Sequence, residues 1–326
     1  MALEIDLGKY RFSEEIAAGV RGKRVLVIGA GTDGGIGQAL AVAAGLNGAD
    51  RVGLHFHRSY ESGLETVEAI NAAGGNAFPA QADLTNSSDC WSMRSHVIRM
   101  MGGKPPDLVL MNSDRAERGY RLGRPPREVD GESAALRRAR VRQAFVDNIG
   151  QSTTVLDTKL HGFISMSHLW AGEAQHFSQP LQMVYLSSRQ AIDPGPGVPG
   201  YVIANFGTLW LPLVLQANLG SGAGLARAFS AALPFIKTKM TAGYADKPQF
   251  WQRWQPRLVE TYEAAHCLLA LLANNPEKLI YQLNVMHHED DDEDALRATW
   301  SEVRLQPLER HIPWSEQSPT VLDPEP

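Results

Sequence analysis

The chain is poor in cysteine, in positive charge and in long apolar runs. Its two cysteines, Cys90 and Cys267, lie far apart in helix-like contexts, which favours buried thiols in a reducing, cytoplasmic compartment over a disulfide framework. The formal net charge of −5 at pH 7 argues against general nucleic-acid binding, which normally needs a basic excess. The first residues are charged throughout and lack the apolar core of an export signal. The best apolar run, residues 209–215, is interrupted by Pro212, so we expect no membrane span.

What remains is a composition typical of a soluble globular protein, with 44% hydrophobic and 21% charged residues in a chain of 326. Short apolar runs alternate with helix-like stretches, and residues 24–28 are apolar in the way that a strand buried on both faces requires. This alternation predicts an α/β fold, a doubly wound parallel sheet of the Rossmann type flanked by helices. The strands are expected at residues 24–28, 51–56, 77–82, 107–111, 183–186 and 279–286, and residues 226–236 are expected to hold another strand and its exit loop.

We expect one domain with an extension at each end. Residues 23–288 form the predicted dinucleotide-binding catalytic domain, residues 1–22 a polar N-terminal extension, and residues 289–326 an acidic C-terminal tail. His287 and His288 adjoin the acidic run, but no ligand spacing supports a metal site there. We therefore predict that the protein uses no metal.

An arginine-rich insert at residues 115–150 interrupts the strand–helix rhythm, and a helix is expected after it at about 153–177. The insert holds nine arginines, at positions 115, 118, 121, 124, 127, 137, 138, 140 and 142. A solvated helix–loop with internal ion pairs is the commonest meaning of such a run. A docking face for an acidic carrier protein or a phosphopantetheine phosphate is the second interpretation. Nucleic-acid binding is the third, and the overall acidity disfavours it.

A glycine-rich loop joins the first predicted strand to an alanine-rich helix. Glycine at this junction permits a tight turn and lets backbone N–H groups approach a pyrophosphate at the helix N-terminus. A purely structural turn is the alternative, and the position between strand and helix favours the dinucleotide. The residues expected to line the cofactor here are Gly31, Asp33, Gly35, Ile36 and Gly37.

The end of the second predicted strand is basic where a reader of a ribose 2′-hydroxyl would be acidic. Arg58 and Ser59, with His57, suit a 2′-phosphate because arginine offers a charge-assisted fork of donors, so we expect NADP(H) rather than NAD(H). An exposed loop arginine is the alternative. Asp83, followed by Leu84 at the tip of the third strand, is expected to accept from the adenine amino group, and a helix N-cap is its rival role.

Residues 186–209 place a hydroxyl, a phenol and an amide around one predicted cleft. A strand leads to Ser188, a Pro/Gly-rich loop follows, and a helix-like segment opens at Tyr201 with Asn205 four residues further on. Such a group predicts a catalytic centre that transfers a proton to or from a carbonyl or an alcohol.

The spacing of these features resembles the short-chain dehydrogenase/reductase superfamily over roughly residues 23–286. The glycine loop matches the G-x-x-x-G-x-G pattern of that family, and Asn112 stands at the second asparagine of its N-N-A-G turn. Pro234, Ile236 and Thr238 stand where the family's P-G-x-x-x-T segment passes the nicotinamide. The resemblance implies that Asn112 and these three residues contact the cofactor.

Two positions depart from that pattern as a pair. The family usually has lysine four residues after its tyrosine, where this chain has Asn205, and asparagine on the preceding helix, where this chain has Lys159. The exchange resembles the ketoreductase domains of type I polyketide and fatty acid synthases. It implies an NADPH-dependent ketoreductase in which Ser188 holds the carbonyl oxygen, Tyr201 donates the proton, Lys159 tunes Tyr201, and Asn205 orders the lysine or a water. Taken singly, Lys159 also fits a solvent-facing residue and Asn205 a packing amide.

Other departures keep two alternatives open. Residues 111–114 and Phe235 differ from the family pattern, which fits a redox-silent cyclase, dehydratase or isomerase that uses Tyr201 and Lys159 as acid and base. Such an enzyme would retain NADP(H) as a structural ligand. A nucleotide-sensing regulator, which would bind the cofactor without turnover, is the third reading.

The expected substrate is a ketone, a β-ketoacyl or polyketide-like small molecule or acyl thioester, and an acyl carrier protein is the expected partner if the substrate is tethered. The superfamily often pairs through the two helices that carry Lys159 and Tyr201, but synthase ketoreductases generally do not, so a homo-oligomer stays open. Four aromatic residues fall where the superfamily has its substrate lid, with ordinary packing as the alternative: Tyr244, Phe250, Trp251 and Trp254.

Overall fold

The computed structural model describes residues 5–117, 119–124, 126–195, 197–219, 224–286 and 296–304. Several features named above lie outside the described residues. They are Arg118 of the insert, the pair His287 and His288, the acidic run at 289–294, and the tail from residue 305.

One eight-stranded sheet forms the centre of the molecule, in the order β3-β2-β1-β4-β5-β6-β7-β8. Its first seven strands run parallel, and β8 is antiparallel to β7 at the edge. The predicted doubly wound sheet is confirmed, with a strand at each expected place. The strands are β1 (Arg24–Ile28), β2 (Arg51–Phe56), β3 (Ala77–Gln81), β4 (Leu108–Met111), β5 (Leu181–Ser188), β6 (Ala226–Leu233), β7 (Ile280–Met286) and β8 (Arg297–Glu302).

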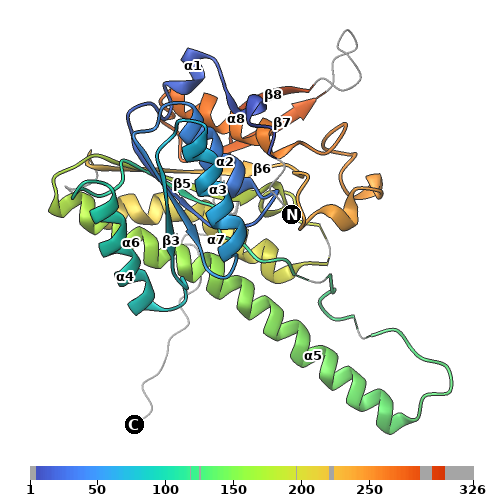
Figure 1. Cartoon of the computed structure of the whole chain (residues 1–326). Coiled ribbons are helices and arrows are strands. Elements are labelled where there is room, and N and C mark those ends of the chain that lie inside the picture. The colour runs from blue at the N-terminus through green and yellow to red at the C-terminus, as the bar shows by residue number, and fades with distance from the viewer. Residues whose placement is uncertain are drawn as a thin grey trace, which may run out of the picture.

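Helices cover both faces of the sheet (Figure 1). On one face, α2, α3 and α8 pack around Val25 and Val27 of β1, and η1 and α1 pack on α2 and α8. On the other face, α4, α6 and α7 pack around Leu26 and Ile28. Strand β1 is therefore buried on both sides, as its apolar sequence predicts. The helices are η1 (Leu7–Tyr10), α1 (Glu14–Ala17), α2 (Ile36–Leu46), α3 (Tyr60–Ala72), α4 (Ser87–Met100), α6 (Gly162–His176), α7 (Pro199–Leu219) and α8 (Thr261–Ala273).

Both predicted extensions contribute to the folded body. In the N-terminal segment, Tyr10, Ala17 and Val20 are buried, and the Phe12 ring meets the His266 ring edge-on at 4.8 Å. At the other end, β8 adds an antiparallel strand to the sheet from within the predicted tail. The sequence patterns missed both because each segment is polar overall and buries only a few side chains.

Helix α5 (Ala134–Leu156) lies in the arginine-rich insert and projects from the body of the molecule (Figure 1). The sequence predicted helix only from about residue 153, so the observed helix begins much earlier. Arg140 binds Glu132 at 2.6 Å, and Arg137 pairs with Glu128. These ion pairs within the insert match the solvated helix–loop interpretation.

Helix α7 is long and apolar enough, by length and composition, to cross a membrane, and it is the one such helix in the described parts of the chain. This corrects the expectation that no apolar run approaches a membrane span. Its inner side packs on β5 and β6, and 39% of its most apolar window is buried. A core helix passes the same test, so the finding is weak evidence for a membrane.

The candidate site is placed by the strand order. The chain moves outward from β1 in one direction to β2 and β3, and in the other direction from β4 to β7, so the order reverses between β1 and β4. Loops at the carboxyl ends of these two strands diverge and leave a crevice, which is where doubly wound folds bind ligands.

Candidate active site

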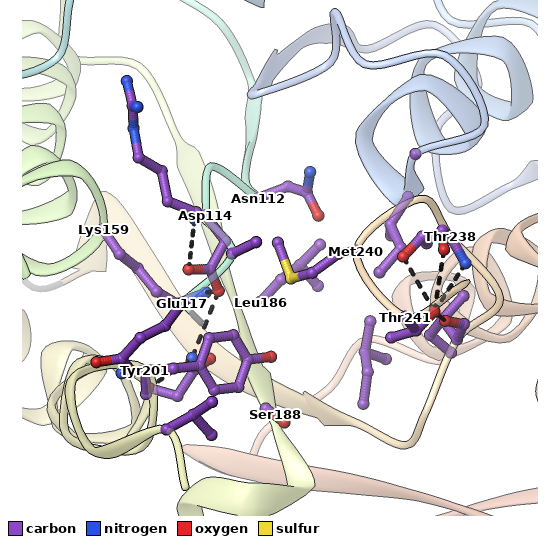
Figure 2. A pocket seen from close by; sticks show the side chains of 18 of the residues that line it. Asn112, Asp114, Glu117, Lys159, Leu186, Ser188, Tyr201, Thr238, Met240 and Thr241 are labelled. Carbon is purple, nitrogen blue, oxygen red and sulfur yellow. Dashed lines mark hydrogen bonds and ion pairs between the residues drawn. The ribbon is translucent and has the colours of Figure 1, made fainter. Parts of the chain in front are cut away.

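A cavity of about 940 Å³ lies at this carboxyl edge of the sheet. Figure 2 shows Tyr201 and Lys159 on one side of it and Thr238, Met240 and Thr241 on the other. Its wall includes every site residue predicted from the sequence except two, which are treated next. The structure therefore gathers the predicted catalytic and cofactor-binding residues from distant segments into one space.

The two exceptions are Asp33 and Gly37. The Asp33 carboxylate forms an exposed ion pair with Lys239 at 3.0 Å. Gly37 lies in the first turn of α2, and a Cβ there would stand 2.2 Å from the Gly29 carbonyl oxygen and 2.6 Å from the Asn112 amide nitrogen. Gly37 is thus required for the close packing of α2 on the loop, which is a supporting role and not a contact with the cavity.

The glycine loop ends at the N-terminus of α2. Gly35 is the N-cap residue of this helix, and its backbone is extended, so the first N–H groups of α2 have no partner within the helix. Gly34 has φ of +64°, a left-handed conformation, and its N–H donates to Gln38 Oε1 at 2.8 Å. The first turn of α2 therefore presents backbone donors and the positive end of the helix dipole to the cavity, which suits a pyrophosphate.

His55 holds the start of the glycine loop through a hydrogen bond. Its Nδ1 accepts from the Gly29 N–H at 3.0 Å, and its Nε2 lies 3.1 Å from the Ala82 carbonyl oxygen. Burial lowers the pKa of this imidazole from 6.5 to about 4, with the Ala82 hydrogen bond opposing the shift. His55 is therefore neutral at pH 7 and ties the ends of β1, β2 and β3 together. The sequence did not indicate this role.

The basic cluster after β2 lines the cavity beside Asp83. His57 Nε2 lies 3.4 Å from Asp83 Oδ2, and Arg58 is exposed. Asp83 Oδ1 accepts from the Thr85 N–H at 2.9 Å, whereas Asn86 caps α4. The alternative of an N-cap role for Asp83 is therefore wrong.

The charge of Asp83 is stabilised at its place in the wall. Burial raises the pKa of its carboxyl, but two hydrogen bonds from Thr85 and the nearby His57 and Arg115 outweigh this, so the pKa lies below its ordinary value. Arg115 also lines the cavity. The sequence assigned Arg115 to the insert alone, since nothing in its local pattern indicates that it lies near β3.

Asn112 follows β4 and faces the glycine loop. Its Nδ2 donates to the Gly29 carbonyl oxygen at 3.0 Å, so the residue joins β4 to the turn after β1. Leu84 and Ser59 also line the cavity, on the side of β2 and β3. The hydrogen bond from Asn112 to Gly29 explains how a single asparagine of the N-N-A-G turn keeps the glycine loop in place.

The segment after β6 forms the opposite wall, with Pro234, Ile236 and Thr238 facing the cavity. Phe235, which replaces the family's glycine, stacks on Trp254 with ring centroids 5.9 Å apart. The Gln255 side chain holds the Phe235 backbone through two hydrogen bonds. It accepts from the Phe235 N–H and donates to the Phe235 carbonyl oxygen, each at 2.8 Å. The phenylalanine is thus accommodated by aromatic packing on Trp254, and both residues line the cavity.

Three of the four predicted lid aromatics line the cavity: Tyr244, Phe250 and Trp254. The indole of Trp254 donates to Asp193 at 2.7 Å, and the Arg253 guanidinium stacks over it at 3.9 Å. The fourth, Trp251, donates to the Tyr244 carbonyl oxygen at 3.0 Å and so shapes the same segment.

Ser188 and Tyr201 meet across the Pro/Gly-rich loop. Ser188 is the last residue of β5, and its Oγ accepts from the Gln190 N–H at 3.2 Å. Burial in the cavity wall raises the pKa of the Tyr201 phenol, the charge of Asp114 raises it further, and a hydrogen bond with Ser188 lowers it in part. The phenol is therefore held in its protonated form at neutral pH, ready to donate a proton.

Lys159 and Asn205 converge on one carboxylate oxygen. Lys159 lies in the π-helical turn η2 (Asp157–His161), and its Nζ lies 2.7 Å from Asp114 Oδ2. Asn205 Nδ2 reaches the same oxygen at 3.4 Å and the Tyr201 carbonyl at 2.9 Å. A π turn often accompanies a functional site, and here it directs the lysine into the cavity wall. Lys159 and Asn205, which are predicted to be an exchanged pair, are thus neighbours in space.

Asn205 retains one unsatisfied atom. Its Oδ1 is buried and has no hydrogen-bond partner among the described residues, although the side chain lines the cavity. A buried amide oxygen without a partner is costly, so this atom suits a water or a ligand donor.

Glu117 holds the start of α7, and the sequence did not indicate it. It is buried, and its carboxylate accepts from the Tyr201 N–H at 2.8 Å, the Gly200 N–H at 3.2 Å and the Ser152 hydroxyl at 2.6 Å. A carboxylate at a helix N-terminus satisfies free N–H groups and interacts favourably with the helix dipole. Glu117 therefore fixes the backbone of Tyr201 from the insert.

No family model matches the chain. It is 40% identical over 94 residues, 29% of its length, to the Short-chain dehydrogenase/reductase homolog YusS of Bacillus subtilis, and it covers 82% of that protein. It is 39% identical over 92 residues to the Hydroxynaphthalene reductase arp2 of Aspergillus fumigatus, and it covers 32% of that protein.

Solved structures share the fold. A short-chain type dehydrogenase/reductase from Mycobacterium marinum aligns with a TM-score of 0.64 at 20% identity, over 80% of this chain and 92% of that one. A dehydrogenase/reductase from Sinorhizobium meliloti 1021 aligns with a TM-score of 0.62 at 18% identity, over the same shares. The chain belongs to the short-chain dehydrogenase/reductase superfamily, and it is an oxidoreductase of that superfamily whose relatives imply a nicotinamide dinucleotide as cofactor.

Proposed function

We propose that the protein is an NADPH-dependent ketoreductase that reduces the ketone of a β-ketoacyl or polyketide-like substrate to an alcohol. One observation carries the proposal. Lys159 and Asn205, which occupy each other's usual family positions, reach the same oxygen of Asp114, at 2.7 and 3.4 Å, beside Tyr201. An exchange that keeps the ammonium and the amide within one small space conserves their chemistry, so it supports a working site and not a lost one.

The residues of the cavity fit the proposed cofactor. The Ile36 N–H in the first turn of α2 suits the pyrophosphate, and Asp83 suits the adenine amino group. Arg58 and Ser59 favour a 2′-phosphate, because no acidic residue stands beside them after β2. When bound, a reduced nicotinamide supplies a hydride to the substrate carbonyl carbon.

The chain's own residues handle the proton. Ser188 at the end of β5 orients the carbonyl oxygen with its hydroxyl, and Tyr201 donates its phenolic proton to the oxygen as charge develops there. Lys159 contributes positive charge to the same wall. Asn205 positions the lysine through Asp114, and its unsatisfied Oδ1 suits a water that returns a proton to Tyr201.

The proposed substrate class rests on aromatic and basic residues of the cavity wall. Tyr244, Phe250 and Trp254 line the cavity, as do Arg121 and Arg253, and the Arg253 guanidinium is paired with Asp193 at 3.2 Å. Aromatic faces suit an acyl chain, and guanidinium groups suit a phosphate such as that of a phosphopantetheine arm. A carrier-tethered thioester therefore suits this lining, and an acyl carrier protein is the proposed partner for such a substrate.

The test combines cofactor titration with turnover. NADPH and NADH are titrated separately, and then a series of β-ketoacyl thioesters and free ketones is incubated with the preferred cofactor while reduced nicotinamide is followed by its absorbance. The proposal expects tighter binding of NADPH and net oxidation of NADPH with one equivalent of alcohol formed. Substrate conversion without net NADPH oxidation would instead establish the redox-silent alternative, and binding without any conversion would establish the regulator.

A further inference from the structure

The carboxylate of Asp114 joins Lys159 to Asn205, and its charge lies at the centre of the site. It follows β4 and accepts from three donors: Lys159 Nζ at 2.7 Å, Asn205 Nδ2 at 3.4 Å and the N–H of Arg115 at 2.8 Å. The Lys159 side chain is 3% exposed and the Asp114 side chain 13%, so this ion pair is sheltered from solvent. Figure 2 shows the pair beside the Tyr201 ring.

The charges around Tyr201 come from three segments. Asp114 follows β4, Lys159 lies in η2, and Glu117 contacts the Tyr201 N–H from the insert. Glu117 faces the backbone of Tyr201, whereas Asp114 is the carboxylate that pairs with Lys159. The Lys159 charge is paired directly with Asp114, so the ammonium cannot act as an unopposed positive charge on the phenol.

The electrostatics of Tyr201 follow this arrangement. Burial raises the pKa of the phenol, the Asp114 charge raises it further, and the Ser188 hydrogen bond lowers it in part. A phenolate in this wall would be desolvated and would face a carboxylate, and both effects disfavour the ionised form.

We propose that Asp114 is a positioning residue that holds Lys159 and Asn205 together and offsets the Lys159 charge, so that Tyr201 acts as a proton donor more readily than as a proton acceptor. This inference rests on the proposed ketoreductase function. In reduction, the carbonyl carbon gains a hydride from the reduced nicotinamide, and the carbonyl oxygen gains the proton of Tyr201 Oη. In the reverse direction, Tyr201 must first lose its proton, so alcohol oxidation is confined to high pH.

The first test needs no change at Asp114. The chain has eight tyrosines, and subtracting the absorbance titration of Tyr201→Phe from that of the wild-type protein isolates the ionisation of Tyr201. The inference expects the phenolate to appear only above about pH 10, the ordinary value for tyrosine. Ionisation near neutral pH would overturn it, because the lysine would then dominate the site.

The second test removes the charge and keeps the shape. In Asp114→Asn, Lys159 is no longer neutralised, so the Tyr201 ionisation should move to lower pH by about one unit or more, a roughly tenfold gain in phenolate at a given pH. Asp114→Glu retains the charge and should stay near the wild-type value. Asp147→Asn on α5 is the matched control, since it makes the same chemical change and the same change in net charge away from the cavity.

The pH profile of alcohol oxidation then separates positioning from structure. In Asp114→Asn the alkaline limb should move to lower pH with the phenol ionisation, whereas a purely structural role would lower kcat without moving the profile. An unchanged Tyr201 ionisation in folded Asp114→Asn would overturn the inference. Because the absorbance titration needs no substrate, failure to find any reducible ketone would refute the proposed function and leave the titration result intact.

Discussion

The two ends of the cavity are lined by different kinds of chemical groups. At the nucleotide end, backbone N–H groups, glycines and the neutral His55 shape the wall, and the positive charge of Arg58 is exposed. At the catalytic end, Asp114, Lys159 and Glu117 place buried or nearly buried charges within hydrogen-bonding distance of one another or of α7. The first end suits recognition of a fixed ligand, and the second suits control of a proton.

The largest expected effect lies at the catalytic end. Replacing Tyr201 with phenylalanine removes the proton donor, so ketone reduction should fall by about 10³-fold, within the usual range for general acid catalysis. Cofactor affinity should stay the same, since Tyr201 is not part of the nucleotide end. Steady-state kinetics and cofactor titration measure the two effects, and Tyr262→Phe on α8 is the matched control. Equal activity in the two variants would contradict the assignment.

The nucleotide end should show its own dependence on pH. The pKa of His55 is lowered from 6.5 to about 4 in the folded protein, so its contribution to stability is present above pH 6.5 and is lost as the pH falls through 4. The expected loss is about 3 kcal/mol between pH 7 and pH 3, measured by urea unfolding. His55→Asn should be less stable at pH 7 and lack this part of the pH dependence. A wild-type slope retained in that variant would place the titrating group elsewhere.

The exposed charge at the nucleotide end should set cofactor choice. Arg58→Ala should weaken NADPH binding by about 30-fold, in line with about 2 kcal/mol for a hydrogen-bonded charge, and leave NADH binding nearly unchanged. Arg227→Ala is the control with the same loss of charge, because Arg227 lies near the amino end of β6, away from the carboxyl ends of the strands. Equal weakening of NADPH and NADH would show that Arg58 does not read the 2′-phosphate.

The smallest expected effect concerns the support of α7. Glu117→Gln removes the charge that faces two helix N–H groups, so the unfolding free energy should fall by about 1 kcal/mol. The kcat should fall modestly, because the Tyr201 backbone is less firmly held. Thermal unfolding measures the first effect, with the exposed Glu128→Gln as control. If Glu117→Gln and Glu128→Gln had the same stability, Glu117 would not stabilise the start of α7.

These two ends also differ in how far the sequence predicts them. The strands, the glycine loop and the residues after β2 were predictable, because each depends on a local pattern at the end of a strand. The glycine at position 37 was assigned to the cavity because the pattern gives spacing but not packing.

The catalytic end needed the structure. The sequence indicated Lys159 and Asn205 only through their predicted exchange. It marked Asp114 only as part of a turn that departs from the family pattern and did not indicate Glu117, and both residues lie in a segment without regular secondary structure. Their roles depend on how α5, η2 and α7 pack together, since each acts on a residue at least 35 positions away. Long-range side-chain contacts of this kind leave no periodic pattern in the sequence.

The central claim is that Lys159 and Asn205 are a functional exchanged pair on Asp114. The most direct measurement compares Lys159→Asn, Asn205→Lys and the double exchange in NADPH-dependent ketone reduction. Because both side chains reach the same oxygen, the account predicts that each single change lowers kcat by about 10²-fold and that the double exchange recovers most of the loss. A double exchange no more active than the single variants would contradict it.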